Sequence, residues 1–476
     1  MSEFSVTLGA IIKENNINIY QLALASGIDR TTLHKVIKGD RTLKREQLSS
    51  LLSMMAITPH EKEMLMRSSE LINGGETLIK QRQKVKTIIE DIGHISSANI
   101  KSIPETEAAT PINTDREETT ALYGKFAVNI AITEIIQHEK NYIYFSMPCS
   151  YRFFYDSLFS RYSSCVDLSI NCFISFCKPN KNALENLDIL ESLIPFLMSS
   201  KNNFQANFIY SNTSLNDLFA IPFPYFIHTS RHSLLISANL DYGIFTANQS
   251  IHECYQTISN DLIQISSQLL VNIESVEELL SFYSKNLPSN AAVLDFIENQ
   301  PCLLKYITRQ MLEKYLINSD SNNLLEQFND YIQRIRSQFR GKANVFTKEG
   351  LDFFLDTGII TILPPNYMSP FNVPDRVLLL RNMLNDLMSD NVHFRLIDDT
   401  KFKIPGCFSI GIINNMSLLI TRLEYGANAA KNIKITEQSI VNAFSDFFVN
   451  LYNSEYTYTK EETIQAIIDS LKKLES

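Results

Sequence analysis

Residues 18–41, NIYQLALASGIDRTTLHKVIKGDR, decide the fold of the N-terminal region. Asn18 and Asp29 are good helix N-caps, and each precedes a run of helix-forming residues. Gly27 can adopt the positive φ of a tight turn, and Gly39 is placed to end the second helix in the C′ position. The stretch therefore predicts two short helices joined by a sharp turn.

More helices are expected on both sides of this pair. The segments LGAIIKENN before it and REQLSSLLSMMAI after it are each long enough for a short helix. The run Thr58-Pro59-His60-Glu61 has the spacing of a capping box with proline at the first helical position. The N-terminal region is therefore predicted to hold five helices.

The second helix of the pair has one apolar face and one cationic face. At about 100° per residue, Leu33, Val36 and Ile37 fall together and are expected to point inward. The opposite face carries hydroxyl groups and long cations and has no acid. Between residues 30 and 45 there are six Lys/Arg and one acid, Asp40. Such a face suits the base edges and phosphates of a DNA major groove.

This region resembles the Cro/C1-type (XRE family) helix-turn-helix over about residues 6–70. The residues that carry the resemblance are Leu22-Ala23, Gly27-Ile28, Arg30-Thr31-Thr32-Leu33, Lys35 and Gly39-Asp40-Arg41. The resemblance implies a lambda-repressor-like five-helix domain of a transcriptional regulator, which binds a double-stranded DNA operator as a homodimer. The residues that it places against DNA are Arg30, Thr31, Thr32, His34, Lys35 and Lys38, with Arg41 and Lys44 at phosphates.

Charge is distributed unequally between residues 1–93 and the rest of the chain. The chain of 476 residues has a formal net charge of -9, but residues 1–93 alone have a net charge of +2. The basic N-terminal region is therefore masked in the net charge of the whole chain by the acidic remainder. The length predicts about three domains.

The seven cysteines are an odd number without a CxxC pair, which favours reduced thiols in a cytoplasm. No run of about 18 apolar residues and no signal peptide is found, so no membrane span is expected.

Several classes of site are absent from the sequence. Glycine is scarce, with 14 residues, and neither GxGxxG nor GxxxxGK[ST] occurs. The pair His228 and His232 and the pair Cys172 and Cys177 lack further ligands for a metal. GxSxG and HExxH are also absent. We expect no cofactor, no metal and no catalytic residues, and hence no enzyme.

The fold class expected is α+β, and the chain divides into five parts. A helix-turn-helix domain over 1–75 and a helix with a polar linker over 76–121 come first. The rest alternates helices with β-rich runs. It is predicted to form a first α/β repeat over 122–270, a helical connector over 271–330 and a second α/β repeat over 331–476.

The duplication rests on six matches in the same order along the chain. SLLISANLDYG at 233–243 recurs as SLLITRLEYG at 417–426. The other matches are Phe-Ser at 145–146 with Phe-Thr at 346–347, FFYDS at 153–157 with FFLDT at 353–357, LMSSKNNFQANFIYSNT at 197–213 with LMSDNVHFRLIDDT at 387–400, Ile-Pro at 221–222 and 404–405, and Gln-Ser-Ile at 249–251 and 438–440. The first copy then carries extra sequence around 161–182.

Two such copies are expected to pack about a pseudo-twofold axis, with any ligand in the groove between them. The ligand-binding residues stay unknown. The C-terminal region is expected to dimerise, to sense a small-molecule or peptide effector, or both.

Two other functions stay open. The duplicated architecture resembles phospholipase D-like proteins, in which each half supplies an H-x-K motif. Here His138-Glu139-Lys140 matches that motif in one half only, and His393-Phe394-Arg395 stands at a non-equivalent place in the other. The chain is therefore alternatively a nucleic-acid-targeted enzyme with a degenerate duplicated domain. A further alternative is a phage or defence regulator that binds a protein or peptide partner.

Overall fold

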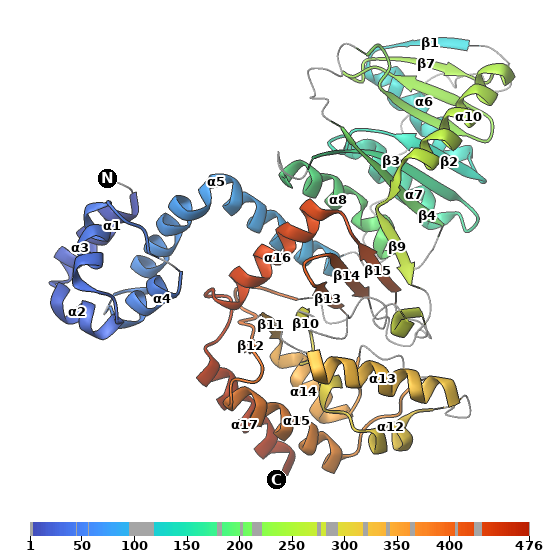
Figure 1. Cartoon of the computed structure of the whole chain (residues 1–476). Coiled ribbons are helices and arrows are strands. Elements are labelled where there is room, and N and C mark those ends of the chain that lie inside the picture. The colour runs from blue at the N-terminus through green and yellow to red at the C-terminus, as the bar shows by residue number, and fades with distance from the viewer. Residues whose placement is uncertain are drawn as a thin grey trace. The chain divides into compact units, whose positions relative to one another are not determined.

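The computed structural model describes most of the chain, and its contacts divide the chain into two units. The N-terminal unit is Met1–Gln83 and the body is Lys84–Ser476 (Figure 1). The residues described are 3–43, 45–55, 57–94, 119–178, 183–199, 203–211, 221–273, 278–281, 294–317, 322–338, 343–361, 367–404, 408–422 and 431–475.

The N-terminal unit is helical. Its helices are α1 (Glu3–Glu14), α2 (Ile19–Ser26), α3 (Arg30–Lys38), α4 (Arg45–Met54) and the first part of α5 (Pro59–His94). α5 continues into the body and is interrupted at Gly75, whose φ of 69° is not helical.

The local signals for these helices are confirmed. Asn18 accepts hydrogen bonds from the N–H groups of Tyr20 and Gln21, and Gly27 ends α2 with a φ of 68°. The capping box is also formed, since Thr58 N donates to Glu61 and Glu61 N donates to Thr58 Oγ1. The helices pack around one small apolar core, whose centre includes Leu8, Leu33, Val36, Leu51 and Leu65.

The body holds two lobes, each built on one mixed sheet. The first lobe, residues 119–268, has an eight-stranded sheet in the order β1-β7-β6-β5-β2-β3-β4-β8. Its elements are β1 (Thr119–Tyr123), α6 (Lys125–His138), β2 (Tyr142–Ser146), α7 (Arg152–Ser164), β3 (Ser169–Cys177), α8 (Ala183–Met198), β4 (Phe204–Ser211), β5 (Tyr225–Thr229), β6 (Ser233–Ile236), β7 (Tyr242–Thr246), α10 (Gln249–Ile265) and β8 (Ser267–Gln268).

The second lobe, residues 270–475, has a seven-stranded sheet in the order β12-β11-β10-β13-β14-β15-β9. Its elements are β9 (Leu270–Ile273), β10 (Leu294–Glu298), the 3₁₀ helix η1 (Leu304–Tyr306), α12 (Arg309–Tyr315), α13 (Asn322–Gln338), β11 (Asn344–Phe346), α14 (Lys348–Thr357), α15 (Val373–Met388), β12 (Phe394–Leu396), β13 (Phe408–Ile413), β14 (Ser417–Arg422), β15 (Lys431–Ile435), α16 (Gln438–Tyr452) and α17 (Lys460–Glu475).

The two sheets have the same topology apart from the short β8. In each, three parallel strands (β2-β3-β4 and β10-β11-β12) adjoin four antiparallel ones (β5-β6-β7-β1 and β13-β14-β15-β9). The expectation of a mixed α+β body with two similar lobes therefore agrees with the structure. The SLLI match is placed correctly, on β6 and β14, and the Gln-Ser-Ile match opens α10 and α16.

The boundaries of the repeat are wrong in one respect. Residues 271–330 are not a helical connector, because β9 and β10 belong to the second sheet and the helices that follow β10 pack in the second core. By strand order, β2 corresponds to β10 and β3 to β11, so the segment 161–182 carries the counterpart of β11 and is not extra. The Phe-Ser and FF matches therefore paired β2 and α7 of the first lobe with β11 and α14 of the second. By strand order β11 corresponds to β3, so these two matches are shifted by one strand and one helix.

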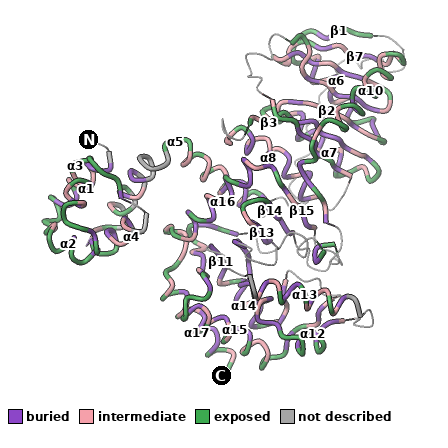
Figure 2. Tube along the Cα trace, in the orientation of Figure 1, coloured by how far each residue is buried: buried purple, intermediate pink, exposed green. Residues whose placement is uncertain are grey.

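The two lobes do not meet about a pseudo-twofold axis. α16 of the second lobe packs on α8 of the first, and Asn186 of α8 donates to Ser439 Oγ over 2.8 Å. Its counterpart α10 lies over β5 and β6 of its own sheet, and Ser259 is its one buried residue. In Figure 2 α10 is accordingly drawn mostly as exposed or intermediate. Because the two lobes contribute different surfaces, the interface is heterologous.

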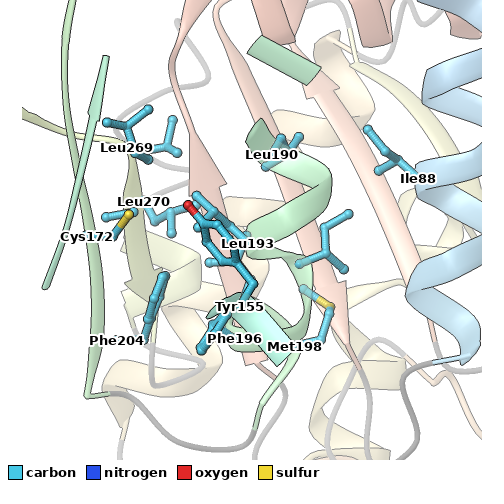
Figure 3. Packing of buried hydrophobic residues seen from close by; sticks show 14 of the residues in the cluster. Ile88, Tyr155, Cys172, Leu190, Leu193, Phe196, Met198, Phe204, Leu269 and Leu270 are labelled. Atoms are coloured by element: carbon cyan, nitrogen blue, oxygen red, sulfur yellow. The ribbon is translucent and has the colours of Figure 1, made fainter. Parts of the chain in front are cut away.

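The contact between the lobes is filled by apolar side chains. One core cluster runs from the first sheet through α8 to α16 and one face of the second sheet. The end of α5 enters the same cluster, and Lys84 forms ion pairs with Asp188 and Glu191 of α8. Figure 3 shows Leu190 and Leu193 of α8 and Ile88 of α5 among the residues of this cluster.

Candidate functional site

The cationic face of α3 is exposed while its apolar face is buried. Leu33 and Val36 are completely buried, and Ile37 packs partly buried against the same core. Of the residues expected at DNA, Arg30, Thr31, Lys35, Lys38 and Arg41 are exposed, Thr32 and His34 are half-buried, and Lys44 lies outside the described residues.

Both ends of α3 are fixed by capping. Asp29 Oδ1 accepts hydrogen bonds from Thr31 N at 2.9 Å and Thr32 N at 3.1 Å. The side chain of Thr31 donates to the same carboxylate, and this bond lowers the pKa of Asp29. Gly39, with a φ of 82°, closes the other end by donating to the carbonyl of Val36. α3 is therefore capped by hydrogen bonds at both ends.

Two contacts orient the long cations beside α3. Arg41 Nη1 donates to Thr32 Oγ1 over 3.2 Å, which brings a cation from the following loop to the exposed side of the helix. The guanidinium of Arg30 lies 5.9 Å from the ring centre of Tyr20 on α2, a cation–π contact. The structure thus gathers hydroxyls and guanidinium groups on one surface, as the sequence predicts for this helix.

The H-x-K match at His138 and Lys140 does not form a site. Both side chains are exposed at the end of α6, and the residue between them, Glu139, is the buried one. Burial raises the pKa of Glu139, but hydrogen bonds from Asn141 N and from Ser230 outweigh it and lower the pKa overall. Glu139 therefore holds the turn before β2 to the β5–β6 hairpin. His393 and Arg395 lie in the second lobe beside Tyr452.

A neutral polar cluster lies under α10 in the first lobe. His228 of β5 is fully buried, and its ring centre is 4.6 Å from that of His252 on α10. Burial, with the neighbouring His252, lowers the pKa of His228 to about 4, so the ring is uncharged at pH 7. Its Nδ1 lies 2.9 Å from Ser233 Oγ. Its Nε2, like Oδ1 of Asn171 on β3, is buried and has no hydrogen-bond partner among the described residues.

His228 belongs to this cluster, but His232 does not. The ring of His228 lies near Tyr142 and Tyr144, whereas His232 stacks on Phe245, 5.1 Å away, in the main core. The described residues contain no group of three or more His, Cys, Asp or Glu that could hold a metal ion. No described helix is both long and apolar enough to span a membrane.

A pocket lies in the second lobe at the end of β10. The pocket is small and has room for about one water molecule. Glu298 is the ionisable carboxyl in its wall, and Ser409 Oγ donates to it over 3.0 Å. Burial raises the pKa of Glu298 to about 7, although the bond from Ser409 opposes the shift. The walls are Glu298, Asn299, Gln300, Pro301, Cys302, Leu303, Leu304, Ile360, Thr361, Phe408 and Ser409.

Other polar residues of this wall form hydrogen bonds that join the segments around the pocket. Thr347 Oγ1 donates to the carbonyl of Asn299, and Gln300 accepts from Thr361 N over 2.8 Å. These bonds fix the start of α14 and the loop at 359–361 around the pocket. The sequence offered one signal for this place that was missed, since Pro-Cys occurs at 148–149 after β2 and at 301–302 after β10.

Comparisons with known proteins add little. No family model matches the chain, and no curated protein matches it. It is similar to TrmBL2, an archaeal chromatin protein whose structure shows a novel mode of DNA binding, with 9% identity, 44% of this chain and 72% of that chain covered, and a TM-score of 0.22. It is also similar to phosphatidylserine synthase from Haemophilus influenzae Rd KW20, with 12% identity, coverage of 75% and 92%, and a TM-score of 0.25. Such low TM-scores carry no argument about this chain.

Proposed function

We propose that the chain is a sequence-specific DNA-binding transcriptional regulator of the Cro/C1 type that acts as a homodimer. The observation that carries the proposal is α3, a helix capped at both ends, with Arg30, Lys35 and Lys38 exposed and its apolar side buried. Hydroxyl groups at its start and cations along its length suit base edges and phosphates.

The local charge supports the same proposal. The exposed side of α3 carries no acid, and the carboxylate of Asp29 at its start is occupied by the N-cap bonds. The rest of the chain is acidic, so it repels DNA and leaves this surface as the favoured contact. In this proposal the side chains that face DNA are Arg30, Thr31, Thr32, His34, Lys35 and Lys38, and Arg41 and Lys44 meet phosphates.

The body is proposed to dimerise and to respond to an effector. The pocket beside Glu298 has room for little more than one water molecule, so we assign the effector to no particular place in the body. His138 and Lys140 are both exposed and do not converge with the second lobe, so we propose no phosphodiester chemistry for them.

DNA binding is tested by selecting duplexes from a random library on the full chain and measuring affinity by fluorescence anisotropy. The double variant Lys35→Ala/Lys38→Ala should weaken binding about tenfold or more and make it less dependent on salt, because it removes two cations from the interface. Thr31→Ala should relax the preference for the selected sequence over a scrambled duplex.

The matched control is Lys13→Ala, which removes an exposed cation of the same unit outside α3. It should leave affinity within about twofold. The proposal fails if no duplex is selected at low salt, or if Lys13→Ala and the double variant weaken binding equally.

A further inference from the structure

The first sheet ends on one side in β1, which has five residues, and on the other in β8, which has two. At the latter edge of this sheet, β8 pairs with β4. The strand that follows β8 in the chain, β9 of the second sheet, also contacts β4. β12, at the edge of the second sheet, is covered by α17 and by a bridge between Ile397 and Thr457. In the described part of the chain, no strand pairs with the outer side of β1.

The register fixes which backbone groups that edge offers. Gly124 N donates to Asp241 O, one step beyond the pair of Tyr123 with Tyr242. Because hydrogen-bonded and non-hydrogen-bonded pairs alternate in an antiparallel ladder, Thr120 and Leu122 bond to β7. The N–H and C=O groups of Thr119, Ala121 and Tyr123 therefore point away from the sheet.

The strand lacks the features that normally protect an edge. Its sequence, TTALY, has neither a charge nor a proline, and all of it except Leu122 is exposed. Three large aromatic side chains are exposed next to it, namely Tyr123 at 76%, Phe126 at 66% and Tyr242 at 51%. An unguarded apolar edge of this kind is a template for pairing with another strand.

We propose that β1 pairs antiparallel with β1 of a second copy of the chain, centred on Ala121. The strand is complementary to itself in this register. Ala121 faces its own copy, and Tyr123 faces Thr119 of the partner subunit, an aromatic side chain opposite a β-branched one. About six hydrogen bonds form, two for each of three facing pairs. The interface is isologous and joins two first sheets into one.

A second copy suits this edge better than the residues that precede it. The segment 95–118 contains Pro104 and Pro111 and several acids, and proline cannot supply the N–H groups of a paired strand. The proposal deepens the homodimer of the proposed function by naming its interface. It is tested without DNA, so that its failure and a failure of DNA binding are separate results.

The test uses self-repulsion at Ala121. Because this residue faces its own copy, Ala121→Glu and Ala121→Lys each place two like charges opposite each other, and like charges in facing positions are destabilising. In sedimentation velocity on the full chain, the wild type should be a dimer. Each variant alone should weaken dimerisation about tenfold or more, and an equimolar mixture of the two should restore the dimer.

Two further variants separate pairing from folding. Ala121→Pro removes an outward N–H and leaves the bonds to β7, so it should give a folded monomer. Ala121→Thr keeps the N–H and should remain a dimer. A monomeric wild type, an undiminished Ala121→Glu dimer, or a mixture of Glu and Lys variants that stays monomeric overturns the proposal.

Discussion

The two lobes of the body share one topology and use it differently. In the second lobe α16 packs on α8 of the first, and its buried residues include Ile440, Phe444 and Phe448. The sheet face beneath it is aliphatic, with Ile410 and Ile412 on β13. In the first lobe α10 holds the same place in the topology, but it is mostly exposed and covers His228.

This difference shows how a duplicated fold divides its tasks. In the second lobe, whose helix α16 joins the lobes, the sheet face under that helix is filled with apolar residues, since that face became interior. The other copy keeps a neutral polar cluster and an open edge at β1. In the second lobe, by contrast, a carboxyl lies in a pocket on the opposite side of the sheet from α16, where the counterpart region of the first lobe is a closed apolar core.

The largest effect is expected from a matched pair in the repeated Gln-Ser-Ile segment. Ile440→Ala in α16 removes a completely buried side chain from the core between the lobes and should cost about 2–5 kcal/mol in the free energy of unfolding. Ile251→Ala in α10 alters a half-buried side chain and should cost about 1 kcal/mol or less. Urea unfolding followed by circular dichroism measures both. Equal costs would show that α10 is as deeply packed as α16.

Glu298→Gln should show that the buried carboxyl of Glu298 makes the stability of the folded chain depend on pH. The folded pKa of Glu298 is about 7, above the ordinary 4.5, so folding favours the protonated acid. Stability is therefore highest below pH 4.5 and falls as pH rises through 7, by up to about 3 kcal/mol. The neutral glutamine should raise the melting temperature at pH 8 and change it little at pH 4.5.

The exposed Glu461→Gln on α17 is the control for this variant and should leave the melting temperature unchanged at both pH values. If Glu298→Gln destabilises the chain at pH 8, the buried carboxylate is stabilised by a partner and the pKa of Glu298 is not raised.

His228 in the first lobe should give the opposite pH dependence. Its folded pKa of about 4 lies below the ordinary 6.5, so its contribution to stability is fully present above pH 6.5 and is lost as pH falls through 4. The loss should be about 2–3 kcal/mol. In His228→Gln this part of the pH dependence between 6.5 and 4 should vanish. An unchanged acid-unfolding curve would show that another group carries it.

The smallest effects are expected at the two N-caps of the counterpart helices. Asn248 caps α10 by accepting from Ser250 N, and Asn248→Ala should cost about 1 kcal/mol. Glu437 caps α16 and also accepts from Tyr210 of the first lobe over 2.7 Å. Glu437→Ala should cost about 2 kcal/mol, because Tyr210 then loses its acceptor. Thermal unfolding distinguishes the two, and a larger loss for Asn248→Ala would contradict the comparison.

The sequence predicts well what is local. Asn18, Asp29, Gly39 and the box from Thr58 to Glu61 act within four residues of themselves, so their bonds could be predicted without knowing the fold. Amphipathic periodicity likewise places Leu33 and Val36 inside.

Pairing between distant segments was harder to predict. β10 has the short apolar pattern LDFIE, and its partners β11 and β13 begin 50 and 114 residues later. The FF match failed because aromatic residues recur wherever an amphipathic helix covers a sheet, and the two pairs stand at different places in α7 and α14. Glu298 and His228 could not be found either, since their chemistry comes from burial, which depends on the whole lobe.

The packing of the end of α5 determines where the chain can be divided into N-terminal and C-terminal fragments. The polar segment after residue 94 looks like the natural boundary between an N-terminal fragment and a C-terminal one. Yet Val85, Ile88, Ile89 and Ile92 are buried in the core that also holds α8 and α16. A C-terminal fragment that starts in the polar segment would expose that core to water and lose several kcal/mol of burial energy. The contacts of the chain divide at Gln83 instead, inside α5.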